Sequence, residues 1–214
     1  MRKHSPSRSD RKGIDMKKLL LGMAALLGVS IAHVGQAATQ TAVFSGGCFW
    51  GVDAVYKHVK GVTEVVSGYA GGAADTAHYE MVSEGNTGHA ESVRVSFDPA
   101  QVTYAQLLQV FFSVAHDPTQ LNHQGPDSGT QYRSAIFYTT PEQQQQAQNA
   151  IQTLTARHVY AAPIVTQVLP LKQFYAAEAH HQNYLALHLT QPYIVFNDLP
   201  KLEQLRKTFP ALYQ

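Results

Sequence analysis

The chain has 214 residues, a net charge of +1 and 44% hydrophobic residues, enough apolar sequence to bury the core of one domain. Charged residues make up only 14% of the chain and form no basic stripe, so electrostatics give no support to nucleic-acid binding. We expect small molecules or peptides as partners, and no nucleic acid.

The N-terminal region has the pattern of an export signal. Met16-Lys17-Lys18 precedes an apolar run, Leu19 to Ile31, and small residues follow around Ala37. We predict a signal over residues 1–37, with a true start at Met16 as an option, and one domain over residues 38–214 that is exported to the periplasm. The alternative is an uncleaved membrane anchor, but glycine and serine interrupt the run, which is shorter than the roughly 20 apolar residues of a spanning helix.

Hydrophobic periodicity predicts alternating strands and helices in the first half of the domain. A loop rich in small and polar residues is expected at 71–88. Lys60-Gly61 ends the first helix and Thr103 caps the second. The expected elements are a strand at 41–45, a helix at 51–59, strands at 62–69 and 91–97, and a helix at 104–115.

The second half starts with a loop of about fifteen residues, 119–133, and loops of this length in compact domains are usually functional or disordered. Its many Gly, Asp, Gln and Tyr residues favour a functional loop. Pro141 suits the first position of a helix. The expected elements are a strand at 134–138, a helix at 142–158, a strand at 164–169, a helix or helical turns at 174–188, and an amphipathic segment at 199–209.

The order of elements from 41 to 138 is β-α-β-β-α-β, which has the spacing of a split βαβ unit. We therefore predict an α+β fold, a two-layer α/β plait with a ferredoxin-like βαββαβ core. An extra helix, an extra strand and a long C-terminal segment would be added to that core. No internal repeat or second domain boundary is visible.

Cys48 is the only cysteine of the chain, so no intramolecular disulfide can form. It follows Gly46-Gly47, between a predicted strand and a predicted helix. At the start of a helix the partial positive charge of the backbone amides favours the thiolate, which is the nucleophilic form of cysteine. The alternative is a buried cysteine that acts as a small hydrophobic residue.

Four segments carry a resemblance to a known family: Gly46–Gly51, Gly85–Glu91, His116–Thr119 and Gln124–Ser134. Together they resemble peptide methionine sulfoxide reductases of the A type, and the similarity extends from about Thr41 to Leu199-Pro200. The resemblance implies reduction of the S epimer of methionine sulfoxide, free or in proteins, without a cofactor or a metal. Residues 38–214 would then be a single catalytic reductase domain.

The resemblance also implies roles for the reacting groups. Cys48 would attack the sulfoxide sulfur, leaving methionine and a cysteine sulfenic acid. Glu91 would donate a proton to the sulfoxide oxygen, because burial raises the pKa of a carboxyl group. Tyr79 and Tyr132 would donate hydrogen bonds to that oxygen. Without the resemblance, Glu91 reads as an exposed residue at a strand end and the tyrosines as packing residues.

Three further residues match the substrate-binding positions of the family. Phe49 and Trp50 would form the pocket for the terminal methyl group, although aromatic residues can equally belong to the core. Asp127 would bind substrate and orient the site, although Asp-Ser-Gly is also an ordinary turn sequence.

The chain departs from the family pattern at two points. Pro126 replaces a small polar residue and removes a backbone donor. The usual C-terminal resolving cysteines are absent, so regeneration requires an external thiol, either a thioredoxin-like protein or a small thiol. We expect a monomer.

Histidine is frequent, with eleven residues, but His180 and His181 are adjacent and the others lack ligand spacing, so we expect no metal site. His181 is expected to pack near the site through hydrogen bonds. Two other functions remain open on the residues alone. A Cys/His hydrolase would need a histidine in hydrogen-bond reach of Cys48, and a peptide-binding module would hold a methionine side chain on Phe49 and Trp50 without changing its oxidation state.

Overall fold

The domain combines helices and strands, which confirms the predicted α+β class. The computed structural model describes Met1 and residues 38–214. The predicted export signal, residues 1–37, otherwise lies outside the described residues. No helix among the described residues is long and apolar enough to cross a bilayer.

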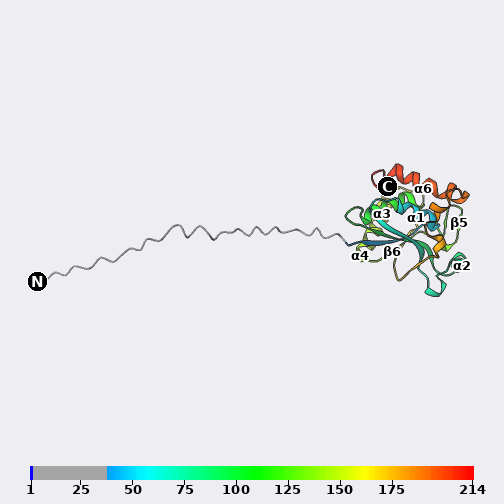
Figure 1. The fold of residues 1–214 in the computed structure, drawn as a ribbon, viewed down its shortest axis with the longest axis horizontal. Helices are drawn as coiled ribbons and strands as arrows, with labels where there is room; N and C mark the ends of the chain where they lie inside the picture. The colour runs from blue at the N-terminus through cyan, green and yellow to red at the C-terminus, as the bar shows by residue number, and fades with distance from the viewer. Residues whose placement is uncertain (2–37) are drawn as a thin grey trace, which may run out of the picture. The chain divides into compact units, whose positions relative to one another are not determined.

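The strands form one curled sheet and one small hairpin (Figure 1). Their bounds are β1 Gln40–Ser45, β2 Val62–Ala70, β3 Ala90–Phe97, β4 His123–Gln124, β5 Asp127–Ser128, β6 Ala135–Tyr138, β7 Gln167–Pro170 and β8 Phe174–Ala176. The order in the sheet is β7-β6-β1-β3-β2-β8. Neighbouring strands are antiparallel except β6 and β7, which are parallel, while β4 and β5 pair only with each other.

The helices differ widely in length. Their bounds are α1 Phe49–Lys57, α2 Tyr79–Ser83, α3 Tyr104–Val110, α4 Pro141–Ala156, α5 Tyr184–Leu187 and α6 Leu199–Thr208. Short 3₁₀ turns span Ala74–Thr76, Thr130–Tyr132 and Ala179–His181, and π-helical turns span Phe111–Ala115 and Ile194–Asp198.

The two faces of the sheet bury different sets of side chains, because successive residues of a strand point to opposite faces. On β1, Phe44 belongs to the large core with α1 and α3, and Val43 to a smaller cluster on the other face. The large core includes stacked rings, with Phe44 5.1 Å from both Tyr56 and Phe111 between ring centroids. This packing fixes α1, and with it Cys48, against the sheet.

Most predicted elements are confirmed within one or two residues. The first helix begins at Phe49 and ends at Lys57, and the glycine expected near its end, Gly61, has a φ of 86°. Thr103 caps α3: its hydroxyl accepts from the amide of Gln106 and its own amide donates to the Gln106 side chain.

Four expected segments were wrong in part. The loop 71–88 contains α2, and the loop 119–133 contains the β4–β5 hairpin; both are too short to show a periodic pattern. The helical segment predicted at 174–188 begins with strand β8, which pairs with the edge of β2 and so depends on a distant partner. The strand predicted at 164–169 is regular only from Gln167 to Pro170.

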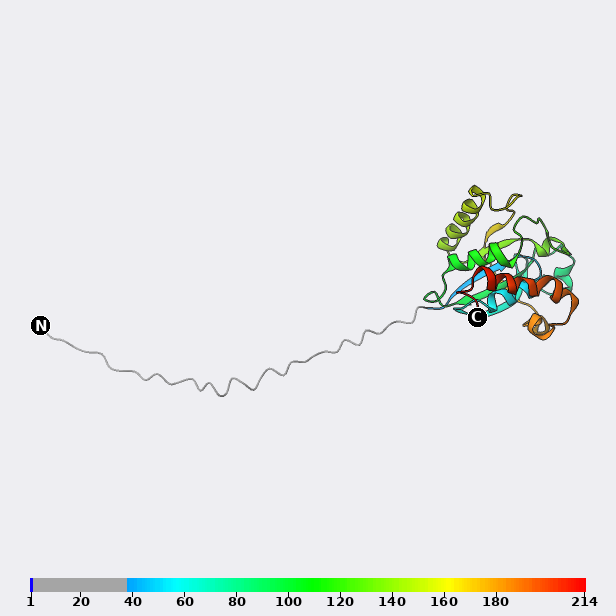
Figure 2. The same cartoon turned by 90° about the horizontal axis from the view of Figure 1, so that it is seen from above.

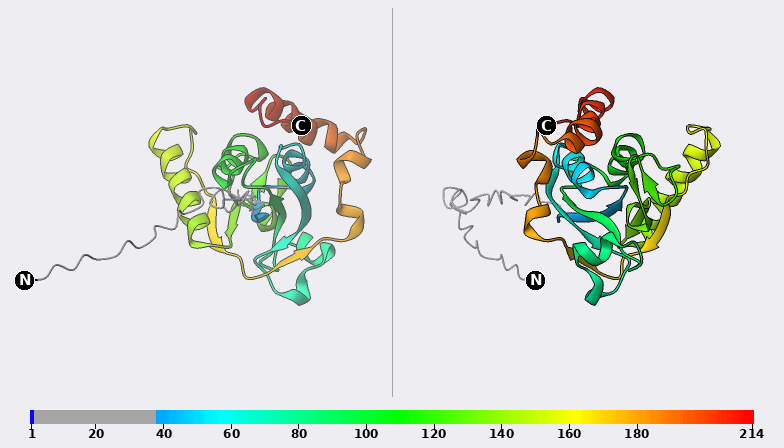
Figure 3. Two further views of the ribbon diagram at one scale, coloured as in Figure 1. Left: turned by 60° about the vertical axis from the view of Figure 1, so that its left-hand side comes forward. Right: turned by 90° about the vertical axis from the view of Figure 1, so that its right-hand side faces the viewer.

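The C-terminal helix α6 lies beside α1 (Figures 2 and 3). Its buried Leu205 joins the large core, and Leu202 packs against a further cluster that contains Ala54 of α1. This contact brings the end of the chain to the helix that begins next to Cys48.

Candidate active site

A tight turn between β1 and α1 presents Cys48. Gly47 has a φ of 87°, and a Cβ there would lie 2.7 Å from Cβ of Gln124, so both the backbone and the space require glycine. Gly46 is equally confined, because the imidazole of His116 occupies the space of its missing side chain. Cys48 is the residue before the first turn of α1 and is 8% exposed. The predicted position of the thiol at a helix start is confirmed.

Glu91 lies next to this turn. Phe44 pairs with Val93 in the sheet, so the start of β3 runs beside the end of β1, where the hydroxyl of Ser45 donates to the carbonyl of Glu91. The Glu91 side chain is 2% exposed, and its Oε2 accepts a hydrogen bond of 3.0 Å from the amide of Phe49. Burial raises the pKa of Glu91 to about 8, although the Phe49 amide opposes this shift. Glu91 is therefore a buried carboxyl group that stays mostly protonated at neutral pH.

The protonation of Cys48 differs from the expectation. Burial raises the pKa of its thiol well above the usual range, and negative charge on Glu91, once that group ionises, and on Asp198 raises it further. The amide of Trp50 and the ammonium of Lys201 act in the opposite direction. The loss of water around the sulfur outweighs the helix N-terminus, so the resting protein holds a thiol rather than the expected thiolate.

Two tyrosines face this pair of groups from separate loops. Tyr79 begins α2 and Tyr132 ends a 3₁₀ turn. Burial raises the pKa of both phenols, the charge of Glu91 raises them further, and that of Cys48 also contributes. Both therefore remain neutral hydrogen-bond donors at physiological pH. The fold thus brings Tyr79 and Tyr132 to Cys48 and Glu91 from distant parts of the chain.

Glu178 holds Tyr79 in place. One oxygen of its carboxylate accepts from the Tyr79 amide at 2.9 Å, and the other accepts from the Tyr69 hydroxyl at 2.8 Å. This bridge anchors the first residue of α2 to the sheet.

Asp127 lies on the β4–β5 hairpin, half-buried. Its Oδ2 accepts a short hydrogen bond from the hydroxyl of Tyr193, a residue that the sequence did not single out. Burial raises the pKa of Asp127, and the Tyr193 bond and the charge of Lys201 oppose this. Asp127 acts in turn on the pKa of Glu91 and Tyr132, so it belongs to the same cluster.

Phe49 and Trp50 form an aromatic wall beside Cys48. The ring of Trp50 stacks on Tyr184 at 3.6 Å between centroids, and its Nε1 donates to Nδ1 of His181 at 3.3 Å. The His181 ring also lies 5.2 Å from that of Phe49 and 4.3 Å from that of Tyr79. The expectation that His181 packs near the site through a hydrogen bond is confirmed.

The buried histidines have partners of other kinds. His116 Nδ1 donates to the carbonyl of Phe111 and its Nε2 is 2.6 Å from the Ser134 hydroxyl, while burial lowers its pKa to about 4. His89 accepts from the amide of Gly72 and donates to the carbonyl of Ala73. Among residues 38–214, no group of three or more His, Cys, Asp or Glu side chains is arranged to hold a metal ion. No histidine in this range hydrogen-bonds the Cys48 thiol, which disfavours a Cys/His hydrolase.

Comparison with known proteins identifies the family. The family model described as peptide methionine sulfoxide reductase matches residues 40–212. The chain belongs to this family. It is 61% identical to peptide methionine sulfoxide reductase MsrA 2 of Mesorhizobium japonicum, over 82% of this chain and 90% of that protein. It is 50% identical to MsrA 2 of Synechocystis sp. over 80% of each chain.

Solved structures agree with this membership. Methionine sulfoxide reductase A of Corynebacterium diphtheriae superposes with a TM-score of 0.68 at 36% identity, covering 73% of this chain and 78% of that one. Reduced Mxr1 of Saccharomyces cerevisiae gives 0.67 at 32% identity, covering 72% and 87%. The chain is therefore a peptide-methionine (S)-S-oxide reductase, which returns methionine sulfoxide to methionine with electrons from a thiol.

Four residues near the site of the reductase were missed in the sequence: Glu178, Tyr193, Asp198 and Lys201. Each acts on a candidate residue through a contact or a charge. Only Asp198 carried a local signal, since an aspartate before Leu199-Pro200 has the pattern of a helix start. The others became visible only through the fold.

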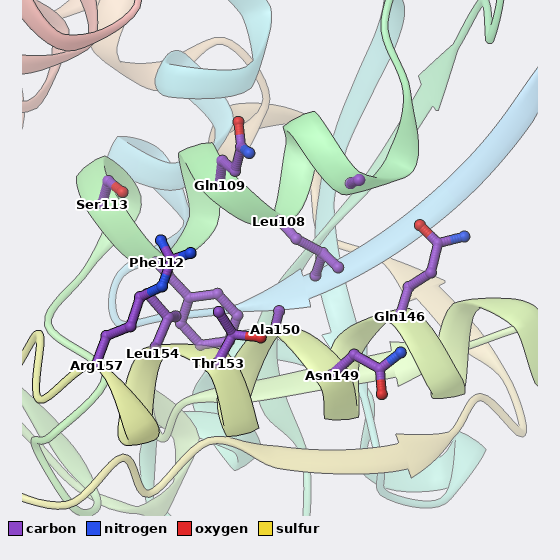
Figure 4. A pocket seen from close by; sticks show the side chains of 11 residues that line it. Leu108, Gln109, Phe112, Ser113, Gln146, Asn149, Ala150, Thr153, Leu154 and Arg157 are labelled. Carbon is purple, nitrogen blue, oxygen red and sulfur yellow. The ribbon is translucent and has the colours of Figure 1, made fainter.

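The reductase also has a cavity away from this site (Figure 4). It has a volume of about 390 Å³ and lies between α3 and α4, where Leu108, Phe112 and Leu154 form an apolar floor beside Gln146 and Arg157. None of the candidate residues lines it, so the chemistry does not take place there.

Proposed function

We propose that Cys48 is the nucleophile of the reductase and Glu91 its general acid. One observation carries this proposal. The buried carboxyl of Glu91, with a pKa of about 8, accepts a hydrogen bond from the amide of Phe49, the residue directly after the only cysteine of the chain. A protonated acid beside a lone thiol is the pair that sulfoxide reduction requires.

The first half-reaction transfers one oxygen atom between two sulfurs. The sulfur of Cys48 attacks the sulfoxide sulfur and forms an S–S bond, while Glu91 gives a proton to the oxygen. The S–S bond and the substrate S–O bond then break as the hydroxyl group passes to the Cys48 sulfur, and the thiol proton replaces the proton that Glu91 gave. The products are methionine and the Cys48 sulfenic acid, so the substrate sulfur gains two electrons and the cysteine sulfur loses them.

Tyr79 and Tyr132 stabilise the negative charge that develops on the oxygen. Both phenols are half-buried and neutral, and negative charge on Glu91 or Cys48 raises the pKa of both. Neutral donors suit this role because they need not ionise. A phenylalanine at either position should lower turnover and leave the binding of methionine product nearly unchanged.

Phe49 and Trp50 provide the surface for the substrate's methyl group, and Asp127 orients the substrate from the β4–β5 hairpin. The close stacking of Trp50 on Tyr184 fixes the orientation of the indole. The bond from Tyr193 fixes the Asp127 carboxylate. A thioether also gains from contact with aromatic rings.

We further propose that an external thiol regenerates the enzyme, because Cys48 has no second cysteine with which to form an internal disulfide. One thiol condenses with the sulfenic acid to give a mixed disulfide and water. A second thiol releases Cys48 and leaves as the disulfide of the reductant. A thioredoxin-like protein or a small thiol fits this chemistry.

The test is a single turnover without reductant. One equivalent of a methionyl sulfoxide peptide should yield one methionine and a stoichiometric sulfenic acid on Cys48, which dimedone traps for mass spectrometry. Turnover should resume on addition of thiol and rise with its concentration. With a racemic peptide, chiral analysis should find the R epimer left over. Multiple turnovers without thiol, or no trapped sulfenate after methionine release, would contradict the scheme.

The fold of the core supports a finer assignment. The four strands β6, β1, β3 and β2 lie side by side in that order, each antiparallel to its neighbours, with α1 after β1 and α3 after β3. We assign this unit to the ferredoxin-like plait, with β7 and β8 as added edge strands.

Export of the enzyme to the periplasm is likewise a proposal, supported by the basic and apolar pattern of residues 16–31. Protein recovered from the periplasmic fraction should start at Ala38 by N-terminal sequencing, whereas an uncleaved chain retained in the membrane fraction would contradict it. The monomeric state stays a prediction that sedimentation analysis can check.

A further inference from the structure

A buried ion pair of the C-terminal segment lies against the helix that begins after Cys48. Asp198 is 0% exposed, and its Oδ1 lies 3.2 Å from Nζ of Lys201, whose side chain is 18% exposed. The two residues come from the last π-helical turn and the first turns of α6.

Gly51 makes room for this pair. A Cβ at Gly51 would overlap Asp198 Oδ1 and would lie 2.7 Å from Nζ of Lys201. Gly51 lies in the first turn of α1, which begins directly after Cys48. The ammonium of Lys201 therefore lies against the helical turn that follows the reacting cysteine.

The hydrogen bonding of this buried ion pair is incomplete. Oδ2 of Asp198 is buried without a hydrogen-bond partner among residues 38–214. Buried ion pairs of this kind often add little stability compared with apolar side chains of the same size. The Asp198–Lys201 pair lies against the start of α1, next to Cys48, and this position indicates an electrostatic role.

Lys201 is the cation that acts on a cluster of acidic groups. Its charge lowers the pKa of Cys48, Asp127 and Asp198 and that of the nearby His116. The titratable groups that face Cys48 are Glu91 from β3, Tyr79 from α2, Tyr132 from its 3₁₀ turn, Tyr193, Asp198 and Lys201.

We propose that Lys201 is an electrostatic positioning residue whose ammonium, from its ion pair with Asp198 at the first turn of α1, stabilises the Cys48 thiolate. This inference rests on the proposed role of Cys48 as nucleophile. Asp198 carries a negative charge, so it moderates the effect of the lysine beside it. Loss of the two side chains should therefore change Cys48 in opposite directions.

The test measures the rate of Cys48 alkylation by iodoacetamide against pH in the intact protein. Because the chain has one cysteine, all label reports on Cys48. Lys201→Met should move the midpoint of the rate profile upward and slow alkylation about threefold to tenfold below the midpoint. Lys201→Arg should restore the wild-type profile, and Asp198→Asn should move the midpoint downward.

Lys57→Met is the matched control. Lys57 also pairs with a buried aspartate of α1, Asp53, at 2.7 Å, but at the far end of the helix. Its loss should leave the alkylation profile unchanged.

A purely structural pair would give another result. If Lys201→Met remained folded by circular dichroism and kept the wild-type midpoint, or if Lys201→Met and Asp198→Asn moved it in the same direction, the proposal would be overturned. If Asp198→Asn failed to fold, the contrast between methionine and arginine at position 201 would still decide. Alkylation needs no sulfoxide, so failure of the proposed reduction would appear separately as absent turnover with a normal profile.

Discussion

Replacement of Glu91 by glutamine should separate the catalytic effect of the acid from the effect of its buried carboxyl on the stability of the fold. The amide has nearly the shape of the protonated carboxyl and can still accept the bond from the Phe49 amide. It carries no acidic proton, so reduction should fall by about 10²- to 10⁴-fold, the usual contribution of a general acid. The variant should lose activity but gain stability over the wild type, and the gain should appear at high pH, where the wild-type carboxyl ionises.

The size of the stability effect follows from the pKa of Glu91, raised from 4.5 to about 8. The native protein keeps a proton that the unfolded chain releases above about pH 4.5, so the contribution of Glu91 to stability is present below that pH. It is lost as the pH rises to about 8. The full shift corresponds to about 5 kcal/mol, an upper limit because the charged side chain can relax toward water.

Denaturant unfolding of wild type and Glu91→Gln at about pH 5 and about pH 8.5 measures this difference. The two proteins should be nearly equally stable at the lower pH. At the higher pH the variant should be more stable by at least about 1.5 kcal/mol, because it has no buried carboxylate to ionise. Parallel stability curves over this range, or full activity of the variant, would refute the role of Glu91 as a buried acid.

Three further substitutions test other parts of the structure. Cys48→Ser should abolish reduction with an unchanged circular dichroism spectrum, since serine cannot cycle through a sulfenic acid; any thiol-dependent turnover would show that another group reacts. Gly51→Ala should destabilise the fold by about 1 to 3 kcal/mol in thermal unfolding, because its methyl group overlaps Asp198, and an unchanged melting temperature would mean that α6 does not press on α1 there. Thr103→Ala should cost about 1 kcal/mol by removing the capping bond to Gln106 while activity stays at the wild-type level, so a loss of activity would argue against a purely local effect.

The sequence was most informative where a local pattern and a reactive residue coincide. The glycines before Cys48 predicted a turn into a helix, and alternation of apolar and polar residues predicted a strand that begins at Glu91. The pattern alone left Glu91 exposed at the strand end, and only the family resemblance favoured a buried acid. The antiparallel pairing of β1 and β3 then brings these two positions together. The short-range pattern and the strand order thus account for the centre of the site.

The protonation state of the Cys48 thiol could not be predicted from the sequence. The helix N-terminus favours a thiolate, but the outcome depends on how much water remains around the sulfur and on which charges lie near it. Those charges include Asp198 and Lys201, about 150 residues away along the chain, and their approach depends on α6 packing beside α1. No periodic pattern encodes such a contact.

The same burial produces two opposing effects at this site. It keeps Glu91 protonated near neutral pH, which supplies the acid, and it suppresses ionisation of Cys48, which limits the nucleophile. A protonated Glu91 lessens the conflict, because a neutral acid does not repel a thiolate. A cation held near the thiol lessens it further without adding an acid of its own. Lys201 is such a cation, and its attachment to α6 links the nucleophile to the C-terminal segment, in a chain whose only cysteine is Cys48.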